Sequence, residues 1–129
     1  MNYYLPAALA LLTLSTTSCL NVGPDTCNAT LVTPVQRATG PKTVAVNQPA
    51  VYTLVYATNT GCGTLGNLGE MVDNTTRTIT LNVNYTGCAC ATPGAVAQTT
   101  YTFQPSQAGT YYLRFTGNSQ YLVDTLVVK

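Results

Sequence analysis

Five cysteines are the side chains of this sequence with the widest chemical repertoire: Cys19, Cys27, Cys62, Cys88 and Cys90. A cysteine can form a disulfide, bind a soft metal ion as a thiolate, or take part in thiol–disulfide exchange. The chain has no histidine, so the most common general base and metal ligand of proteins is missing. The spacing of the cysteines therefore decides which chemistry the sequence favours.

Cys19 follows an apolar leader, which is described below and predicts export, and it is therefore set aside here. Four cysteines remain, and an even number in a short exported domain indicates disulfides. Cys88 and Cys90 are separated by one residue, a spacing at which a direct bond is strained. Each is therefore expected to bond a distant partner. The preferred pairing is Cys62–Cys88 with Cys27–Cys90.

A metal-binding or small-molecule-binding site that uses Cys88 and Cys90 is the alternative interpretation, as is a redox-active pair. The two residues form a C-x-C motif, whereas zinc sites typically contain C-x-x-C. No basic residue lies nearby in the sequence to lower a thiol pKa. We therefore expect structural disulfides, with no metal and no cofactor.

The leader that precedes Cys19 predicts export. Residues 5–14 form an apolar run that is too short to cross a bilayer of ~30 Å as a helix and is typical of a signal peptide. Small residues and then Cys19 follow, which resembles the lipobox of bacterial lipoproteins, although Thr16 stands where that family usually has leucine. The resemblance implies cleavage after residues 1–18, the lipoprotein signal peptide, and lipidation of Cys19. The expected location is the bacterial cell envelope, anchored to the outer membrane, or secreted if Cys19 is not lipidated.

Charges and carboxylates argue against catalysis and against nucleic acid. The chain has 129 residues with five Lys+Arg and four Asp+Glu, a net charge of +1, which provides no basic surface for nucleic acid. Because the chain has no histidine, its carboxylates cannot join a serine and a histidine in a catalytic set. No catalytic residue is therefore expected.

Asp124 is expected on the exposed face of its strand or paired with Arg114. Residues 61–66 spell G-x-G-x-x-G, but Thr86 stands where the dinucleotide fingerprint needs an acid.

Alternating apolar and polar residues predict an all-β protein. In residues 77–85, Ile79, Leu81 and Val83 alternate with polar side chains, which is typical of a half-buried strand. Residues 51–58 are apolar on both sides and predict a central strand. Further strands are expected at residues 30–32, 42–47, 99–104, 110–116 and 121–129. Only residues 65–72 suggest a turn of helix, and their glycines weaken it.

One short motif resembles immunoglobulin-like domains. Gln107, Gly109 and Tyr111 stand where those domains have an acidic residue, a small residue and a corner tyrosine before strand F. The resemblance implies that the Tyr111 hydroxyl bonds the backbone a few residues upstream. The expected fold is an antiparallel immunoglobulin-like β-sandwich of about seven strands over residues 42–129, after an N-terminal segment, residues 19–41.

The sequence is also similar to small uncharacterised bacterial lipoproteins, through residues 61–63, 85–90 and 109–115. That resemblance implies no known activity. We expect a non-enzymatic, envelope-anchored interaction or structural module whose partners are the membrane, through the lipid at Cys19, and an unidentified envelope protein or glycan. A proteinase-inhibitor-like module is a further alternative, because immunoglobulin-like sandwiches can present inhibitory loops.

Overall fold

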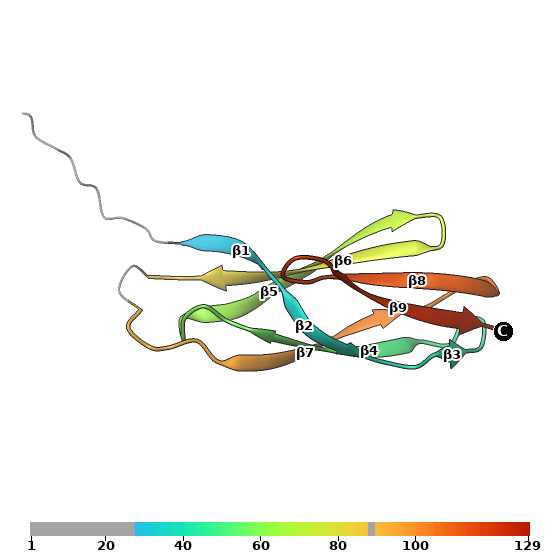
Figure 1. Cartoon of the computed structure of the whole chain (residues 1–129), viewed down its shortest axis with the longest axis horizontal. Coiled ribbons are helices and arrows are strands. Elements are labelled where there is room, and N and C mark those ends of the chain that lie inside the picture. Colours follow the sequence, from blue (N-terminus) through green and yellow to red (C-terminus); the bar gives the residue numbers. More distant parts are fainter. Residues whose placement is uncertain (1–27, 88–89) are drawn as a thin grey trace, which may run out of the picture.

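Nine strands form two sheets in the computed structural model, which describes residues 28–87 and 90–129 (Figure 1). No helix occurs in these residues. The larger sheet, sheet A, contains β1 (Ala29–Thr33), β6 (Thr76–Tyr85), β8 (Gly109–Thr116), β9 (Tyr121–Val128) and β3 (Thr43–Val44) in that order, with β5 (Gly63–Asp73) also paired to β6. The smaller sheet, sheet B, contains β2 (Val35–Thr39), β4 (Ala50–Ala57) and β7 (Val96–Phe103).

β6 organises sheet A, because it has neighbours on both sides along its length. β5 pairs with one edge of β6 in an antiparallel hairpin. On the other edge, the first half of β6 pairs with β8 and the second half pairs with β1. Sheet A curls into a half-barrel as a result of this arrangement, and its concave face covers sheet B.

Two strand pairs are parallel, β6 with β8 and β3 with β9. The prediction of an all-β protein is confirmed, with two sheets. The expected antiparallel arrangement of about seven strands differs from the structure in these two parallel pairs and in the strand number. The physical reason for the first pair lies in the connection. The chain leaves β6, passes through β7 in sheet B, and returns to sheet A as β8, and such a crossover is what parallel pairing requires.

The alternation of apolar residues is confirmed in the most regular strands. Ile79, Leu81 and Val83 of β6 are completely buried, and β4 is the central strand of sheet B. Aromatic rings join the two sheets: the Tyr52 and Phe115 ring centroids lie 5.7 Å apart. Burial of these side chains provides most of the driving force for packing the sheets together.

Residues 65–72 do not form a helical turn; they belong to β5, so that expectation is wrong. Pairing with the regular strand β6 overrides the weak local preference, and a bulge between Leu65 and Leu68 takes up the extra residues. A two-residue turn then joins β5 to β6. Asn74 adopts a φ of 52° there, a left-handed conformation that asparagine tolerates better than most residues.

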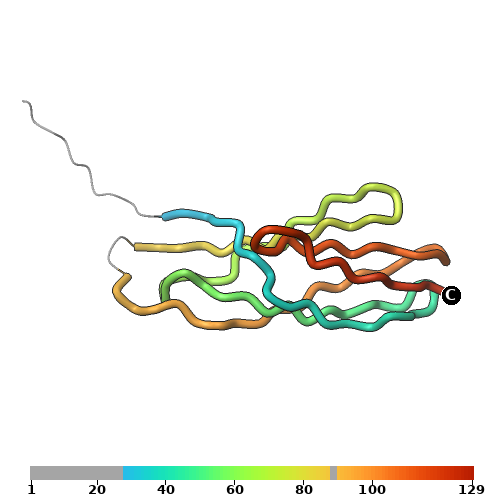
Figure 2. The backbone as a smooth tube through the Cα atoms, in the orientation of Figure 1, coloured from blue at the N-terminus to red at the C-terminus, as the bar shows by residue number. Residues whose placement is uncertain are grey.

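Residues 29–39 fall within the N-terminal segment expected before the sandwich, and they form β1 and β2. The strand expected at residues 30–32 is confirmed as part of β1. β1 pairs with β6 in sheet A and β2 pairs with β4 in sheet B. Pro34 stands between them and cannot donate a ladder hydrogen bond, so the chain leaves one sheet and joins the other at this point. Figure 2 shows this blue-to-teal segment running diagonally from one layer to the other. The expected signal peptide, Cys19, Cys27 and Cys88 lie outside the described residues.

Candidate functional site

A groove of about 490 Å³ lies where three separate parts of the chain meet. Its walls come from the passage between β1 and β2, the end of β4, and the turn that joins β8 to β9. The volume falls within the range of ordinary ligand pockets. The polar lining residues are Gln36, Asn59, Asn118, Ser119 and Gln120, and the apolar ones include Val35, Ala57 and Leu122.

Amide and hydroxyl groups dominate the chemistry of this groove. Each Asn or Gln side chain offers an acceptor oxygen and two donor hydrogens, and the serine hydroxyl can do both. Among residues 28–87 and 90–129, no charged side chain lines the groove. A charged ligand would lose its hydration there without gaining a counter-charge. The groove is therefore suited to an uncharged ligand that has many hydrogen-bonding groups.

The turn between β8 and β9 depends on a glycine. A side-chain carbon at Gly117 would lie 2.3 Å from the backbone oxygen of Gln120, so no larger residue fits without a shift of the backbone. The same turn also lines a second hollow of about 250 Å³, together with Thr116 and Tyr121. Asn118 and Gln120 of this turn therefore line both hollows.

A disulfide fixes the loop that carries Asn59. Cys62 is bonded to Cys90, with their Cα atoms 5.9 Å apart. The backbone N–H of Gly61 donates to the Thr92 carbonyl at 2.9 Å, and the Tyr85 hydroxyl accepts the Asn59 N–H at 2.8 Å. These contacts hold one wall of the groove in place.

The preferred disulfide pairing is corrected by this bond. Cys90, and not Cys88, is the partner of Cys62, because an isolated antiparallel bridge between Thr60 and Pro93 aligns the two loops. With its sulfur in the disulfide, Cys90 is unavailable as a metal ligand or as half of a redox pair with Cys88. The G-x-G-x-x-G segment that contains Cys62 leads into strand β5 and not into a helix.

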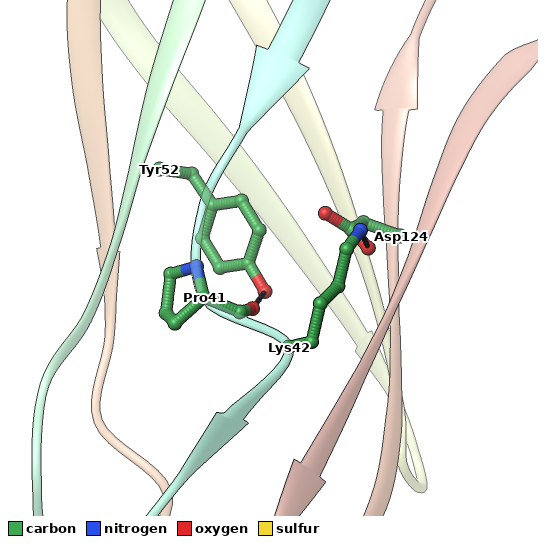
Figure 3. Close-up of polar contacts among 4 residues, drawn as sticks. All are labelled: Pro41, Lys42, Tyr52 and Asp124. Atoms are coloured by element: carbon green, nitrogen blue, oxygen red, sulfur yellow. Dashed lines mark hydrogen bonds and ion pairs between the residues drawn. The ribbon is translucent and has the colours of Figure 1, made fainter.

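Asp124 is buried, contrary to the expectation that it is exposed or paired with Arg114. It shares the inner face of β9 with Leu126 and Val128, and only 8% of its surface is exposed. Its carboxylate accepts a hydrogen bond from the Lys42 ammonium (Figure 3). The Lys42 side chain is mostly exposed, so its stem reaches over the surface to cover the acid.

Tyr52 completes the contacts drawn in Figure 3. Its hydroxyl donates to the Pro41 carbonyl at 2.8 Å. Burial, and secondly the negative charge of Asp124, raise the pKa of Tyr52 to about 12. Together, the Tyr52 hydrogen bond and the Lys42–Asp124 pair fasten the segment before β3 to both sheets, which indicates a structural role.

The hydroxyl of Tyr111 donates to the Gln107 carbonyl at 3.0 Å. The expected hydrogen bond to the backbone a few residues upstream is therefore present. The ring packs in the core, where its centroid lies 5.1 Å from that of Phe103.

A polar cluster beneath the β5–β6 hairpin has no counterpart in the sequence analysis. The Arg77 guanidinium lies over the Phe103 ring, 5.2 Å from its centroid, and Arg77 Nε is 3.8 Å from Glu70 Oε1. The Tyr101 hydroxyl is buried beside them and makes no hydrogen bond of regular geometry within the described residues. Burial first, and then the charge and the close polar contact of the Glu70 carboxylate, raise the pKa of Tyr101 well above its ordinary value.

Residues 28–87 and 90–129 contain neither a metal-binding cluster nor a membrane-spanning helix. Nowhere in these ranges do three cysteine or acidic side chains gather closely enough to hold a metal ion. Nor do these ranges contain a helix long and apolar enough to span a membrane.

The sequence does not predict the groove. The Gly117-Asn118 pair marks a turn, but nothing in the spacing of Gln36, Asn59 and Asn118 shows that they meet. The whole chain matches no protein-family model, no curated protein and no solved structure.

Proposed function

We propose that this protein is a non-enzymatic interaction module of the bacterial cell envelope, and that its groove holds part of an uncharged envelope glycan. The observation that carries the proposal is the amide-lined groove of about 490 Å³, whose described lining residues carry no charge. Sugar hydroxyls both donate and accept hydrogen bonds, and the side chains of Gln36, Asn118 and Gln120 can satisfy both kinds of group. The apolar part of the lining suits the C–H surface of a sugar ring.

The proposed setting is that of a lipoprotein. Residues 1–18 would be removed as a signal peptide, and Cys19 would carry the lipid, so that the membrane is the first partner. If Cys19 is not lipidated, the module is secreted. The Cys62–Cys90 disulfide supports this setting, because such bonds persist in oxidising compartments outside the cytoplasm.

An immunoglobulin-like sandwich is the proposed fold class. The Tyr111–Gln107 hydrogen bond supports it. The order β2-β4-β7 in one sheet, and the neighbours β8-β9-β3 in the other, also support it. The parallel pairing of β6 with β8 is a departure from the usual arrangement of such domains.

Calorimetric titration with neutral oligosaccharides tests the groove. We suggest malto-, cello- and chito-hexaose as probes, with uncharged hexapeptides of Ser, Gly and Asn as the competing class. Asn118→Ala and Gln120→Ala should each weaken binding about fivefold, because each removes a hydrogen bond worth about 1 kcal/mol. The control is Gln98→Ala, an exposed amide on β7 that lies outside the groove.

Three results of the titration distinguish the proposed glycan site from its alternatives. Oligosaccharide binding that weakens in the two groove variants and not in Gln98→Ala supports the proposal. Binding of peptides alone would overturn the glycan. Binding that no groove variant affects would overturn the groove as the site.

A further inference from the structure

The turn between β8 and β9 separates the groove from the second hollow. Both are lined by the four residues of this turn, Gly117, Asn118, Ser119 and Gln120. The strand that follows the turn divides them: Leu122 lines the groove, whereas its neighbour Tyr121 lines the second hollow. Because successive residues of a strand point to opposite faces, the two hollows lie on opposite sides of the end of this hairpin.

The second hollow has the same polar chemistry as the groove and adds an aromatic ring. Its described lining residues carry no charge, and the amides of Asn118 and Gln120 again offer both donors and acceptors. Tyr121 is 43% exposed. At about 250 Å³, the second hollow is smaller than an ordinary ligand pocket. It is therefore suited to one part of a ligand that is also bound elsewhere.

A neighbouring side chain holds the Tyr121 ring in place. The Arg114 guanidinium lies 4.1 Å from the centroid of that ring, and such stacking fixes the orientation of both groups. Arg114 is not among the residues that line the second hollow, so the guanidinium does not cover the part of the ring that lies in the hollow. A tyrosine ring of fixed orientation loses little conformational entropy when a ligand packs on it.

We propose that one linear, uncharged glycan chain passes over the β8–β9 turn, with neighbouring sugar units in the groove and in the second hollow, and with one unit packed on the Tyr121 ring. This inference rests on the proposed function and specifies its ligand as a chain of several units. The turn is low where the chain crosses it, because Gly117 has no side chain and Ser119 has a small one. Binding of one unit raises the effective concentration of the next unit at the other hollow, so the affinity should increase with chain length.

Calorimetric titration over a series of chain lengths tests this inference. We suggest the malto-, cello- and chito-oligosaccharides from disaccharide to hexaose, with weakly bound members measured by competition against the hexaose. The hexaose should bind at least tenfold more tightly than the disaccharide of the same series, because a disaccharide fills only the larger groove.

Two variants distinguish the hollows. Tyr121→Ala should weaken hexaose binding about tenfold, because the apolar contact with the ring is lost, and should leave disaccharide binding unchanged. Gln36→Ala should weaken the binding of both, because Gln36 lines the groove and not the second hollow. Tyr121→Phe keeps the ring and should bind the hexaose as the wild type does.

Tyr112→Ala is the matched control. Tyr112 is 45% exposed, lies on the same face of the β8–β9 hairpin as Tyr121, and lines neither hollow. Its removal should leave the affinities for disaccharide and hexaose unchanged. Thermal melts of all variants should confirm that they are folded.

Three results would overturn the inference and leave the proposed function in place. They are equal affinity for disaccharide and hexaose, hexaose binding that Tyr121→Ala does not weaken, and disaccharide binding that Tyr121→Ala weakens as much as hexaose binding. In each of these cases an oligosaccharide still binds. Absence of binding by every oligosaccharide would overturn the proposed function, and this inference with it.

Discussion

The hydroxyl groups of Tyr52, Tyr101 and Tyr111 lie in different environments and therefore contribute differently to the stability of the fold. Tyr52 and Tyr111 each donate to a backbone carbonyl, whereas the buried Tyr101 hydroxyl makes no regular hydrogen bond to any part of the chain that the structure describes. A buried hydroxyl that is hydrogen-bonded stabilises the fold, and one without a partner costs free energy. The three residues should therefore respond differently to removal of the same oxygen atom.

Tyr111→Phe should lower the free energy of unfolding by about 1 kcal/mol, the usual net contribution of one hydrogen bond. The lost bond is the one to the Gln107 carbonyl. Tyr112→Phe, at a position that is 45% exposed, should change stability very little. Urea unfolding of both variants measures the difference. A larger loss for Tyr112→Phe than for Tyr111→Phe would contradict the corner role of Tyr111.

Tyr101→Phe should leave stability unchanged or increase it by up to about 1 kcal/mol, because it removes a buried hydroxyl that makes no regular hydrogen bond within the described residues. The aromatic ring, and its contact with the Phe115 ring, are kept. The same urea titration applies. A clear loss of stability would mean that the hydroxyl is hydrogen-bonded after all.

Stability should fall in alkali because of Tyr52. Its pKa rises from 10.0 to about 12 on folding, so the phenol ionises more readily in the unfolded chain. The resulting stabilisation is fully present below pH 10 and is lost as the pH rises from 10 to about 12. Tyr52→Phe should make the free energy of unfolding fall less steeply over this interval. Equal slopes for the variant and the wild type would show that Tyr52 does not contribute.

Among the elements, β6 has the strictest division between a buried and a solvated face. Leu81→Asp should unfold much of the population, because it places a carboxylate where no surface is exposed. Asn82→Asp should be mild, because Asn82 faces outward and the variant loses only the exposed hydrogen bond that the Asn82 amide donates to Asn67 Oδ1 at 3.3 Å. Circular dichroism melts compare the two variants. Similar melting temperatures would refute the assignment of the two faces.

The elements also show where prediction from the sequence succeeds and where it ends. β6, β7 and β8 follow from alternation, because their inner residues, such as Leu81 and Phe115, are strictly apolar. β5 does not, because its pattern is broken by a bulge and by glycines, and only its pairing with β6 makes it a strand. Arg77 and Glu70 meet only because the β5–β6 hairpin brings them together. The groove could not be predicted at all, because loops from distant parts of the chain build it.

On the scale of the whole molecule, the proposed lipid at Cys19 determines where the two sheets operate. The first described residues and Lys129 lie at opposite ends of the molecule (Figure 1). An anchored N-terminus would therefore place the start of β1 nearer to the membrane than the C-terminus.

Cys19→Ser tests the anchor. If a lipid on Cys19 holds the protein at the membrane, the variant should be released or should keep its leader, because one apolar run of ten residues does not anchor a chain by itself. Fractionation of cells followed by intact mass measurement distinguishes these results. A variant of mature size that stays with the membranes would contradict lipid anchoring.

The parallel pair of β3 and β9 has a consequence for the order of events after synthesis. Thr43 pairs with Val127, so sheet A cannot close until nearly the last residue of the chain is available. Contacts between such distant residues make folding slow. If the chain is exported as proposed, it would still be extended when it reaches the export channel, and pairing of β3 with β9 and oxidation of Cys62 with Cys90 would then both take place on the far side of the membrane.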